Sequence, residues 1–200
     1  MKNQLVEIIK KYNMNGFIYH DGWGTDKDDL HSYCDYYESV LKPFINKEIN
    51  VLELGVYYGC SSILWHDYLP KSKLVMLDIE DNINPKCWDI MDDNRFTYKN
   101  CDAYVKESSI EVKKLQPEGF DLIFDDGPHT IDSQVTTLEL YLDQLNVGGK
   151  MFIEDIQDVK YFNTLEDVVK KMEGDYITEQ IDLRENKNRY DDLIFVVTKR

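Results

Sequence analysis

The sequence lacks the features of several classes of protein. No apolar run approaches the roughly 18 residues that a membrane-spanning helix needs. The first residues, MKNQLVEIIKKYN, contain neither an apolar signal-peptide core nor a small-residue cleavage site. Internal repeats and low-complexity linkers are also missing. We therefore expect one cytoplasmic domain over residues 1–200, formed by an N-terminal helical cap (1–48) and a core (49–200).

Positive charge is scarce. Lys and Arg number 23 against 38 Asp and Glu, which gives a formal net charge of −15. Proteins that bind nucleic acids or anionic membranes usually present a basic surface. We therefore expect no nucleic-acid partner and no membrane partner, and a cationic or neutral small ligand is the easier one to accommodate.

Paired cysteines are missing as well. The four cysteines, Cys34, Cys60, Cys87 and Cys101, show no CxxC spacing. Zinc sites and disulfide frameworks usually show regular cysteine spacings. We expect reduced thiols, most of them buried.

Apolar strands alternate with helices along most of the chain, which is typical of a parallel sheet covered by helices on both faces. The last two strands are separated by a short polar connection containing ENKNR, which leaves no room for a helix, so they are expected to form an antiparallel hairpin. Two helices, with Asp28 or Asp29 capping the second, should pack outside the sheet. The expected strands cover 49–55, 73–79, 95–100, 120–126, 150–155, 176–183 and 190–198, and the expected helices include 3–13, 28–45, 61–69 and 132–145.

The stretch VLELGVYYGCSS runs from a strand through a turn into a helix, with Gly55 and Gly59 at the ends of the turn. The spacing is not GxGxxG, so a dinucleotide pyrophosphate is not indicated. Glu53 and the tyrosines of the turn suit a cationic ligand instead. Asp78 ends the next strand, where a ribose is usually bound, and Asp102 follows the third, where it can accept a hydrogen bond from an adenine amine.

A second set of acids ends the next two strands, in FDDGPHT and MFIED. Neighbouring parallel strands bring Asp126, Glu154 and Asp155 to one edge of the sheet. Three carboxylates so close together require a positive charge, and oxygen ligands suit Mg²⁺. His129, with an ordinary pKa of about 6.5, is a usable general base beside them.

The order ELGxxxG, LDI, NCDA and FDLIFDDG resembles the class I S-adenosylmethionine-dependent methyltransferases over residues 49–198. FDDGPHT, Gln134 and GGKMFIEDI further resemble the macrocin-type sugar O-methyltransferase group. The resemblance implies an α/β, Rossmann-like sheet of seven strands in the order 3-2-1-4-5-7-6, with strand 7 antiparallel. It also implies Mg²⁺-dependent methyl transfer from S-adenosylmethionine to a sugar hydroxyl that is bound to the metal and deprotonated by His129.

The resemblance also implies roles for individual residues. The ELG loop would hold the methionine part of the cofactor, Asp78 the ribose, and Asp102 with Ala103 the adenine. The full set of cofactor-binding candidates is Glu53, Gly55, Tyr57, Gly59, Ser61, Ser62, Asp78, Asp102, Ala103 and Asp125. Asp126, Glu154 and Asp155 would be metal ligands, and Asp126 and His129 catalytic residues.

The N-terminal GTDKDDLHSYCDYYE resembles an element, TDK…H.Y…Y, that closes over cofactor and substrate in small members of this group. It makes Thr25, Asp26, Lys27, His31 and Tyr33 candidates for substrate contact.

Other functions stay open from the sequence. Catechol-type O-methyltransferases share the metal layout but have a lysine at the position of His129, so methylation of a phenol is the main alternative. A metal-dependent hydroxylase would need two histidines and a carboxylate, and that pattern is missing. The sugar, its hydroxyl and the pathway are not specified. The acceptor can be a free sugar, a nucleotide-sugar, a glycan or a glycosylated metabolite, and the oligomeric state is open, with a homo-oligomer among the expectations.

Overall fold

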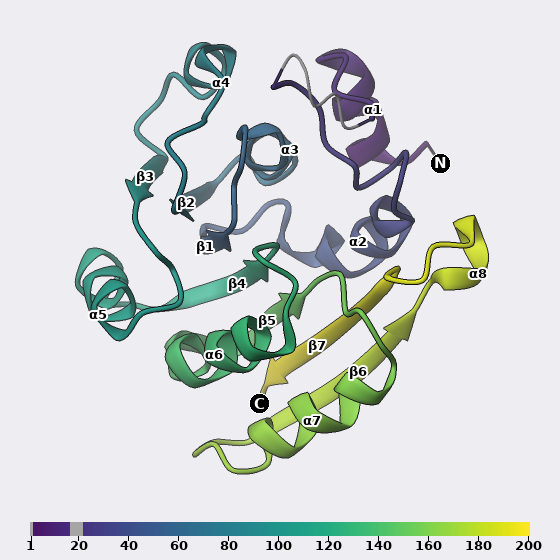
Figure 1. The fold of residues 1–200 in the computed structure, drawn as a ribbon. Helices are drawn as coiled ribbons and strands as arrows, with labels where there is room; N and C mark the ends of the chain where they lie inside the picture. The colour runs from purple at the N-terminus through teal and green to yellow at the C-terminus, as the bar shows by residue number, and fades with distance from the viewer. Residues whose placement is uncertain (1, 17–21) are drawn as a thin grey trace.

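The computed structural model describes residues 2–16 and 22–200, which form a seven-stranded sheet with helices on both faces (Figure 1). The strand order is β3-β2-β1-β4-β5-β7-β6. Strands β1 to β5 pair in parallel, and β7 runs antiparallel to both β5 and β6. The bounds are β1 Ile49–Leu54, β2 Ser72–Asp78, β3 Phe96–Asn100, β4 Phe120–Asp125, β5 Leu145–Ile153, β6 Tyr176–Asp182 and β7 Leu193–Lys199. The predicted Rossmann-like fold, strand order and terminal hairpin are confirmed.

Helices cover the two faces in two groups (Figure 1). One face carries α1 Gln4–Lys11, α2 Tyr33–Leu41, η1 Lys42–Phe44, α3 Cys60–Tyr68 and α4 Pro85–Ile90. The other carries α5 Lys106–Leu115, α6 Ile131–Tyr141, η2 Leu142–Gln144 and α7 Lys160–Val169. Alternate residues of each strand pack against the helices of one face or the other, because successive side chains of a strand point to opposite faces. In β1, Val51 packs with the first group and Leu52 with the second.

Aromatic side chains join the N-terminal helices to the sheet. The rings of Trp65, Phe124 and Phe152 stack in a row, with centroids 4.3 and 5.1 Å apart. Tyr37 of α2 lies edge-on to each of the three. Such edge-to-face pairs add to the stability gained from burial alone. Tyr37 therefore packs α2 against β4, β5 and α3.

The predicted start of the second helix was wrong. Helix α2 begins at Tyr33, because the backbone before it forms turns in which Leu30 and His31 both donate to the carbonyl of Asp26. Asp28 and Asp29 therefore do not cap it. The connection between β6 and β7 also differs from expectation, since it contains a single helical turn, α8 Arg184–Lys187.

The four cysteines are free thiols, three of them buried and Cys101 half-buried, as expected. Within the described part of the chain, every helix is too short or too polar to cross a membrane.

Candidate active site

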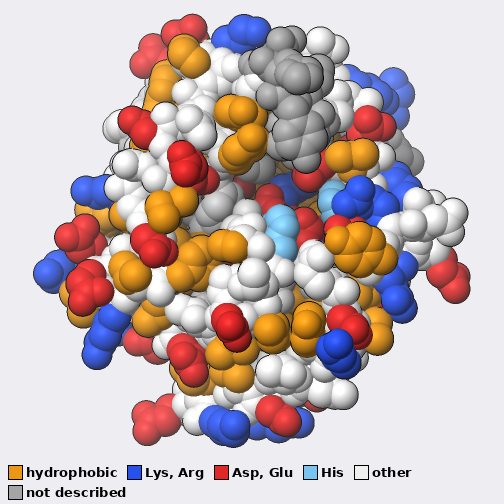
Figure 2. Space-filling model, in the orientation of Figure 1, with side chains coloured by type: hydrophobic (Ala, Val, Ile, Leu, Met, Phe, Trp, Pro, Cys, Tyr) orange, Lys and Arg blue, Asp and Glu red, His pale blue; other side chains and the backbone are white. Residues whose placement is uncertain are grey.

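A cavity of about 820 Å³ opens where the loops after β1, β2, β3 and β4 meet. On the face drawn in Figure 2, histidine and acidic side chains lie together in a hollow near the centre. Of the residues predicted from the sequence, the lining includes Thr25, Asp26, Gly55, Tyr57, Ser61, Asp78, Asp102, Ala103, Asp126 and His129. Six of the ten cofactor candidates thus share one cavity with the catalytic candidates Asp126 and His129.

The turn after β1 depends on glycine. Gly55 has a φ of 81°, which disfavours other residues. A Cβ at this position would also lie 2.2 Å from the carbonyl oxygen of Asp126. The loops after β1 and β4 are therefore in direct contact, so the cofactor end of the cavity touches the acidic end.

Asp78 organises the same turn through backbone hydrogen bonds. Its Oδ2 accepts from the amides of Val56 (2.7 Å) and Tyr57 (2.6 Å), and its Oδ1 accepts from the amide of Glu80 (2.8 Å). Tyr57 has a φ of 48°, which is uncommon for a residue with a side chain and is a strain often found at functional sites. Asp102 similarly accepts from the amide of Tyr104 at 2.8 Å.

Four cofactor candidates lie outside the cavity lining: Glu53, Gly59, Ser62 and Asp125. Glu53 points into the aromatic layer, where it accepts hydrogen bonds from Trp65 Nε1 (2.8 Å) and the Ser62 hydroxyl. The β1 alternation causes this, since Glu53 lies on the same face as Val51. Gly59, with a φ of 90°, is the N-cap residue of α3, which begins at Cys60. Ser61 and Ser62 lie within the helix and therefore do not cap it.

Asp125 is directed away from the cavity into the opposite layer. It accepts hydrogen bonds from the hydroxyls of Tyr104 (2.6 Å) and Thr137 (2.7 Å). Burial raises the pKa of Asp125 to about 6, although these hydrogen bonds oppose the shift. Because Asp126 is the next residue, its side chain leaves the strand on the other side, toward the cavity.

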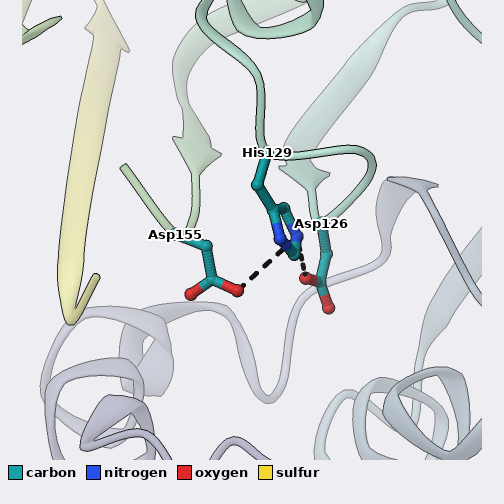
Figure 3. A group of neighbouring side chains, drawn as sticks. All are labelled: Asp126, His129 and Asp155. Atoms are coloured by element: carbon teal, nitrogen blue, oxygen red, sulfur yellow. Dashed lines mark hydrogen bonds and ion pairs between the residues drawn. The ribbon is translucent and has the colours of Figure 1, made fainter. Parts of the chain in front are cut away.

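Asp126 and Asp155 converge on His129 from adjacent strand ends (Figure 3). The Nε2 of His129 lies 3.2 Å from Asp126 Oδ1 and 3.5 Å from Asp155 Oδ2. One ligand atom from each of the three residues falls within 4.8 Å of the others, close enough for all to reach one ion. His129 and Asp155 both have a positive φ, 57° and 54°, which is the backbone strain expected at a functional site.

A segment before α2 and the start of that helix, which we call the strap (residues 22–37), covers the acidic side chains from the other side. Its contacts are ion pairs and hydrogen bonds: Lys27 with Asp126 and Glu154, His31 with Asp192 (2.6 Å) and Asp155 (3.4 Å), Tyr33 with Asp155, and Tyr37 with Glu154. Lys27, His31 and Tyr33 are therefore brought to the predicted acids, although they do not line the cavity.

The charges of this cluster shift its protonation. Burial lowers the pKa of His129, but the hydrogen bond and charge of Asp126, with the charge of Asp155, outweigh it and raise that pKa to about 9. Burial opposes ionisation of Asp126, yet Lys27 and His129 hold its pKa below the usual range. The imidazole is thus protonated at neutral pH while no other cation is bound.

Sequence reasoning missed four contributors to the site. Tyr37 was assigned only to the apolar face of its helix, and Asp192, which holds His31, was not considered. Tyr104 and Arg189 both line the cavity, and Arg189 pairs with Asp191 at 3.0 Å. The adjacent acids Asp191 and Asp192, directly before an apolar strand, were the signal available in the sequence.

Comparison with known proteins identifies the family. Residues 52–156, just over half of the chain, match the family described as a methyltransferase domain. The chain belongs to this methyltransferase family. The match confirms the methyltransferase resemblance drawn from the motifs.

Two of the curated relatives of this methyltransferase are named as O-methyltransferases of glycosylated or macrocin-type compounds. It is 26% identical over 144 residues to 8-demethyl-8-alpha-L-rhamnosyl tetracenomycin-C 2'-O-methyltransferase of Streptomyces olivaceus, a match covering 67% of this chain and 35% of that protein. It is 25% identical over 141 residues to demethylmacrocin O-methyltransferase of Streptomyces fradiae, covering 67% and 33%. The chain thus spans about a third of the length of the curated relatives it matches.

Solved structures share the fold of this methyltransferase. The MycE methyltransferase in complex with Mg, SAH and mycinamycin VI superposes with a TM-score of 0.70 at 18% identity, covering 99% of this chain and 54% of that one. An O-methyltransferase from Bacillus cereus in complex with SAH gives a TM-score of 0.63 at 14% identity, covering 100% and 92%. Mg and SAH, the demethylated form of S-adenosylmethionine, are among the ligands named for MycE, in agreement with the expected cofactors.

Proposed function

We propose that this methyltransferase transfers a methyl group from S-adenosylmethionine to a sugar hydroxyl of a glycosylated small molecule or glycan, with Mg²⁺ bound at the acidic cluster. One observation carries the proposal: Asp126 and His129 line the same cavity as Gly55, Asp78 and Asp102. A cofactor held by the loops after β1 to β3 therefore faces an acid and a base.

The side chains present fit a hard divalent cation. Asp126, which lines the cavity, and Asp155, which is buried behind it, both direct a carboxylate oxygen toward His129, and Glu154 lies next to them. Oxygen ligands and incomplete enclosure by protein are what Mg²⁺ usually accepts. When bound, the ion would lower the pKa of an alcohol ligand and fix its direction.

His129 would then act as the general base. The added positive charge lowers the pKa of a neighbouring imidazole, so the ring can accept a proton at neutral pH. S-adenosylmethionine would supply the methyl group: its carbon would bond to the hydroxyl oxygen, and the sulfur would keep the electron pair of the broken carbon–sulfur bond. His129 Nε2 would take the hydroxyl proton. The remaining contribution of the protein is to bring acceptor and cofactor into line.

The sugar acceptor is supported by the relatives, whose names specify rhamnosyl and macrocin substrates. His129 also favours an alcohol, because a phenol is already acidic enough to react with less help from a base. The hydroxylase alternative lacks support among the described residues, since the candidate ligand group holds a single histidine.

Transfer of labelled methyl groups from S-adenosylmethionine to a panel of deoxyhexosides and catechols, with Mg²⁺ or with EDTA, tests the proposal. We expect transfer to glycosides that EDTA abolishes and that His129→Ala lowers by about 10²- to 10⁴-fold. Binding of S-adenosylhomocysteine, followed by thermal shift, should survive His129→Ala and serves as the control for folding. Preference for catechols, or transfer unaffected by both EDTA and the substitution, would refute it.

A further inference from the structure

Lys27 is buried inside the acidic cluster, with only 1% of its surface exposed. Its Nζ lies 2.9 Å from Asp126 Oδ2 and forms an ion pair with Glu154. The rings of Tyr33 and Trp65 lie 6.0 Å from the same nitrogen. A buried ammonium group is tolerated only when it is paired and hydrogen-bonded, so these two carboxylates are what keeps Lys27 inside.

The two aspartates divide their carboxylate oxygens between the strap and His129. Asp126 gives Oδ2 to Lys27 and turns Oδ1 toward His129. Asp155 gives Oδ1 to Tyr33 and turns Oδ2 toward His129. Glu154 differs, because one oxygen pairs with Lys27 and the other accepts from Tyr37. An ion beside His129 would therefore be within reach of one oxygen of each aspartate, but would reach Glu154 only by displacing Lys27 or Tyr37.

We propose that Lys27 is a positioning residue that acts as a built-in counter-ion: it holds Asp126 and Glu154 in place and competes with the divalent ion for them. This inference rests on the metal binding included in the proposed function. Before the metal binds, the ammonium group relieves the repulsion among three adjacent carboxylates and keeps them together. The same positive charge repels a second cation a few ångströms away.

The test is a calorimetric titration of MgCl₂ into the metal-free protein and into Lys27→Met, with neither cofactor nor acceptor present. Methionine keeps the length of the side chain and removes the charge. We expect the variant to bind Mg²⁺ tighter by roughly tenfold or more, since unit charges at such distances interact by more than the 1.4 kcal/mol that a tenfold change requires. Equal or weaker binding by the variant would overturn the competition.

Lys113→Met is the matched control. Lys113 pairs with Asp143 at 2.8 Å on the surface, with both side chains more than half exposed. The substitution changes the net charge of the protein equally but lies outside the cavity. We expect Mg²⁺ affinity within about twofold of the parent protein, because solvent screens exposed charges. A tenfold gain in this control would mean that net charge alone explains the effect, and would overturn the inference.

A double variant covers the case in which Lys27→Met does not fold without metal. Glu154→Gln, alone and combined with Lys27→Met, removes one of the two carboxylate charges that pair with Lys27. We expect Lys27→Met to raise Mg²⁺ affinity by a smaller factor in the Glu154→Gln background than in the parent protein, because the effects of substitutions at residues in contact are non-additive. A full tenfold gain there would show that Glu154 is not involved.

The outcomes also separate the inference from the proposed function. If neither the parent protein nor any variant binds Mg²⁺, the proposed metal site is refuted. The proposed competition between Lys27 and Mg²⁺ is then refuted as well. If the parent and Lys27→Met bind equally well, only the competition is refuted. Loss of sugar methylation leaves the titration interpretable, because the titration uses no acceptor.

Discussion

The two halves of the cavity hold their carboxylates by different means. Asp78 and Asp102, after β2 and β3, accept hydrogen bonds from backbone amides. Asp126 and Asp155, after β4 and β5, rely on charged or hydroxyl side chains from the strap and on His129. Backbone donors are fixed by the fold, whereas side-chain cations can be displaced. The carboxylates of the first half are therefore held rigidly, whereas those of the second half are held by partners that the proposed Mg²⁺ would displace.

The strongest test of this comparison replaces one acid in each half of the cavity with its amide. Asp78→Asn should weaken S-adenosylhomocysteine binding by roughly tenfold to a hundredfold, since a hydrogen bond to a charged group contributes about 1.5–3 kcal/mol. Asp126→Asn should weaken Mg²⁺ binding by a similar factor and leave S-adenosylhomocysteine affinity within about threefold. Calorimetry of both variants with both ligands checks this. Equal losses of both ligands in both variants would mean that the two halves are not separate.

A second test concerns the tyrosines of the strap. Tyr37→Phe leaves an oxygen of buried Glu154 without its donor, so we expect a loss of about 1–3 kcal/mol in the free energy of unfolding. Tyr190→Phe is the control, because Tyr190 is 65% exposed and its hydroxyl donates to Gln157 at the surface. That change should stay within about 0.5 kcal/mol. Urea unfolding of both variants measures the difference, and similar losses would contradict it.

The pH dependence of His129 sharpens the comparison further. Its folded pKa of about 9 exceeds the ordinary value of 6.5, so the protonated ring is favoured in the folded protein. The stability this contributes is complete below about pH 6.5 and is lost as the pH rises through 9. A nuclear magnetic resonance titration should show that pKa, and Mg²⁺ should lower it by about one unit or more. A value unmoved by Mg²⁺ would place the ion elsewhere.

The smallest effect is expected outside the cavity. Lys113→Met breaks an exposed ion pair with Asp143, and such pairs contribute about 0–1 kcal/mol. We expect a change in the free energy of unfolding below about 1 kcal/mol in low salt, and less at 1 M salt because the charges are screened. A larger loss in urea unfolding would show that this exposed ion pair stabilises the protein more than such pairs usually do.

Much of the fold followed from local pattern. The strands around Val51, Leu74 and Ile123 are continuous apolar runs, which need no distant information to be recognised. Glu53 was expected to contact the cofactor, but its side chain points into the aromatic layer on the same face of β1 as Val51. Strand alternation determines this direction. The placement of Lys27 is different in kind, since its partner Glu154 lies 127 positions away. Only tertiary structure decides whether a lysine after Asp26 faces solvent or enters a core.

The apolar spacing over 28–45 misplaced the start of α2 for a related reason. Periodicity continued through Leu30, but the amides of Leu30 and His31 share the Asp26 carbonyl in a turn. Those turns direct Lys27 toward Asp126 and Glu154. They direct His31 toward Asp155 and Asp192. Long-range charge pairing prevailed there over helical propensity, which is a weak preference.

The contact between His31 and Asp192 joins positions 161 apart in the chain. Asp192 directly precedes β7, which inserts between β5 and β6. Gly55, Asp78 and Asp102 of the cavity's first half all precede Asp192 in the chain, so they are synthesised before the contact between His31 and Asp192 can form. Topologies dominated by such distant pairings fold slowly.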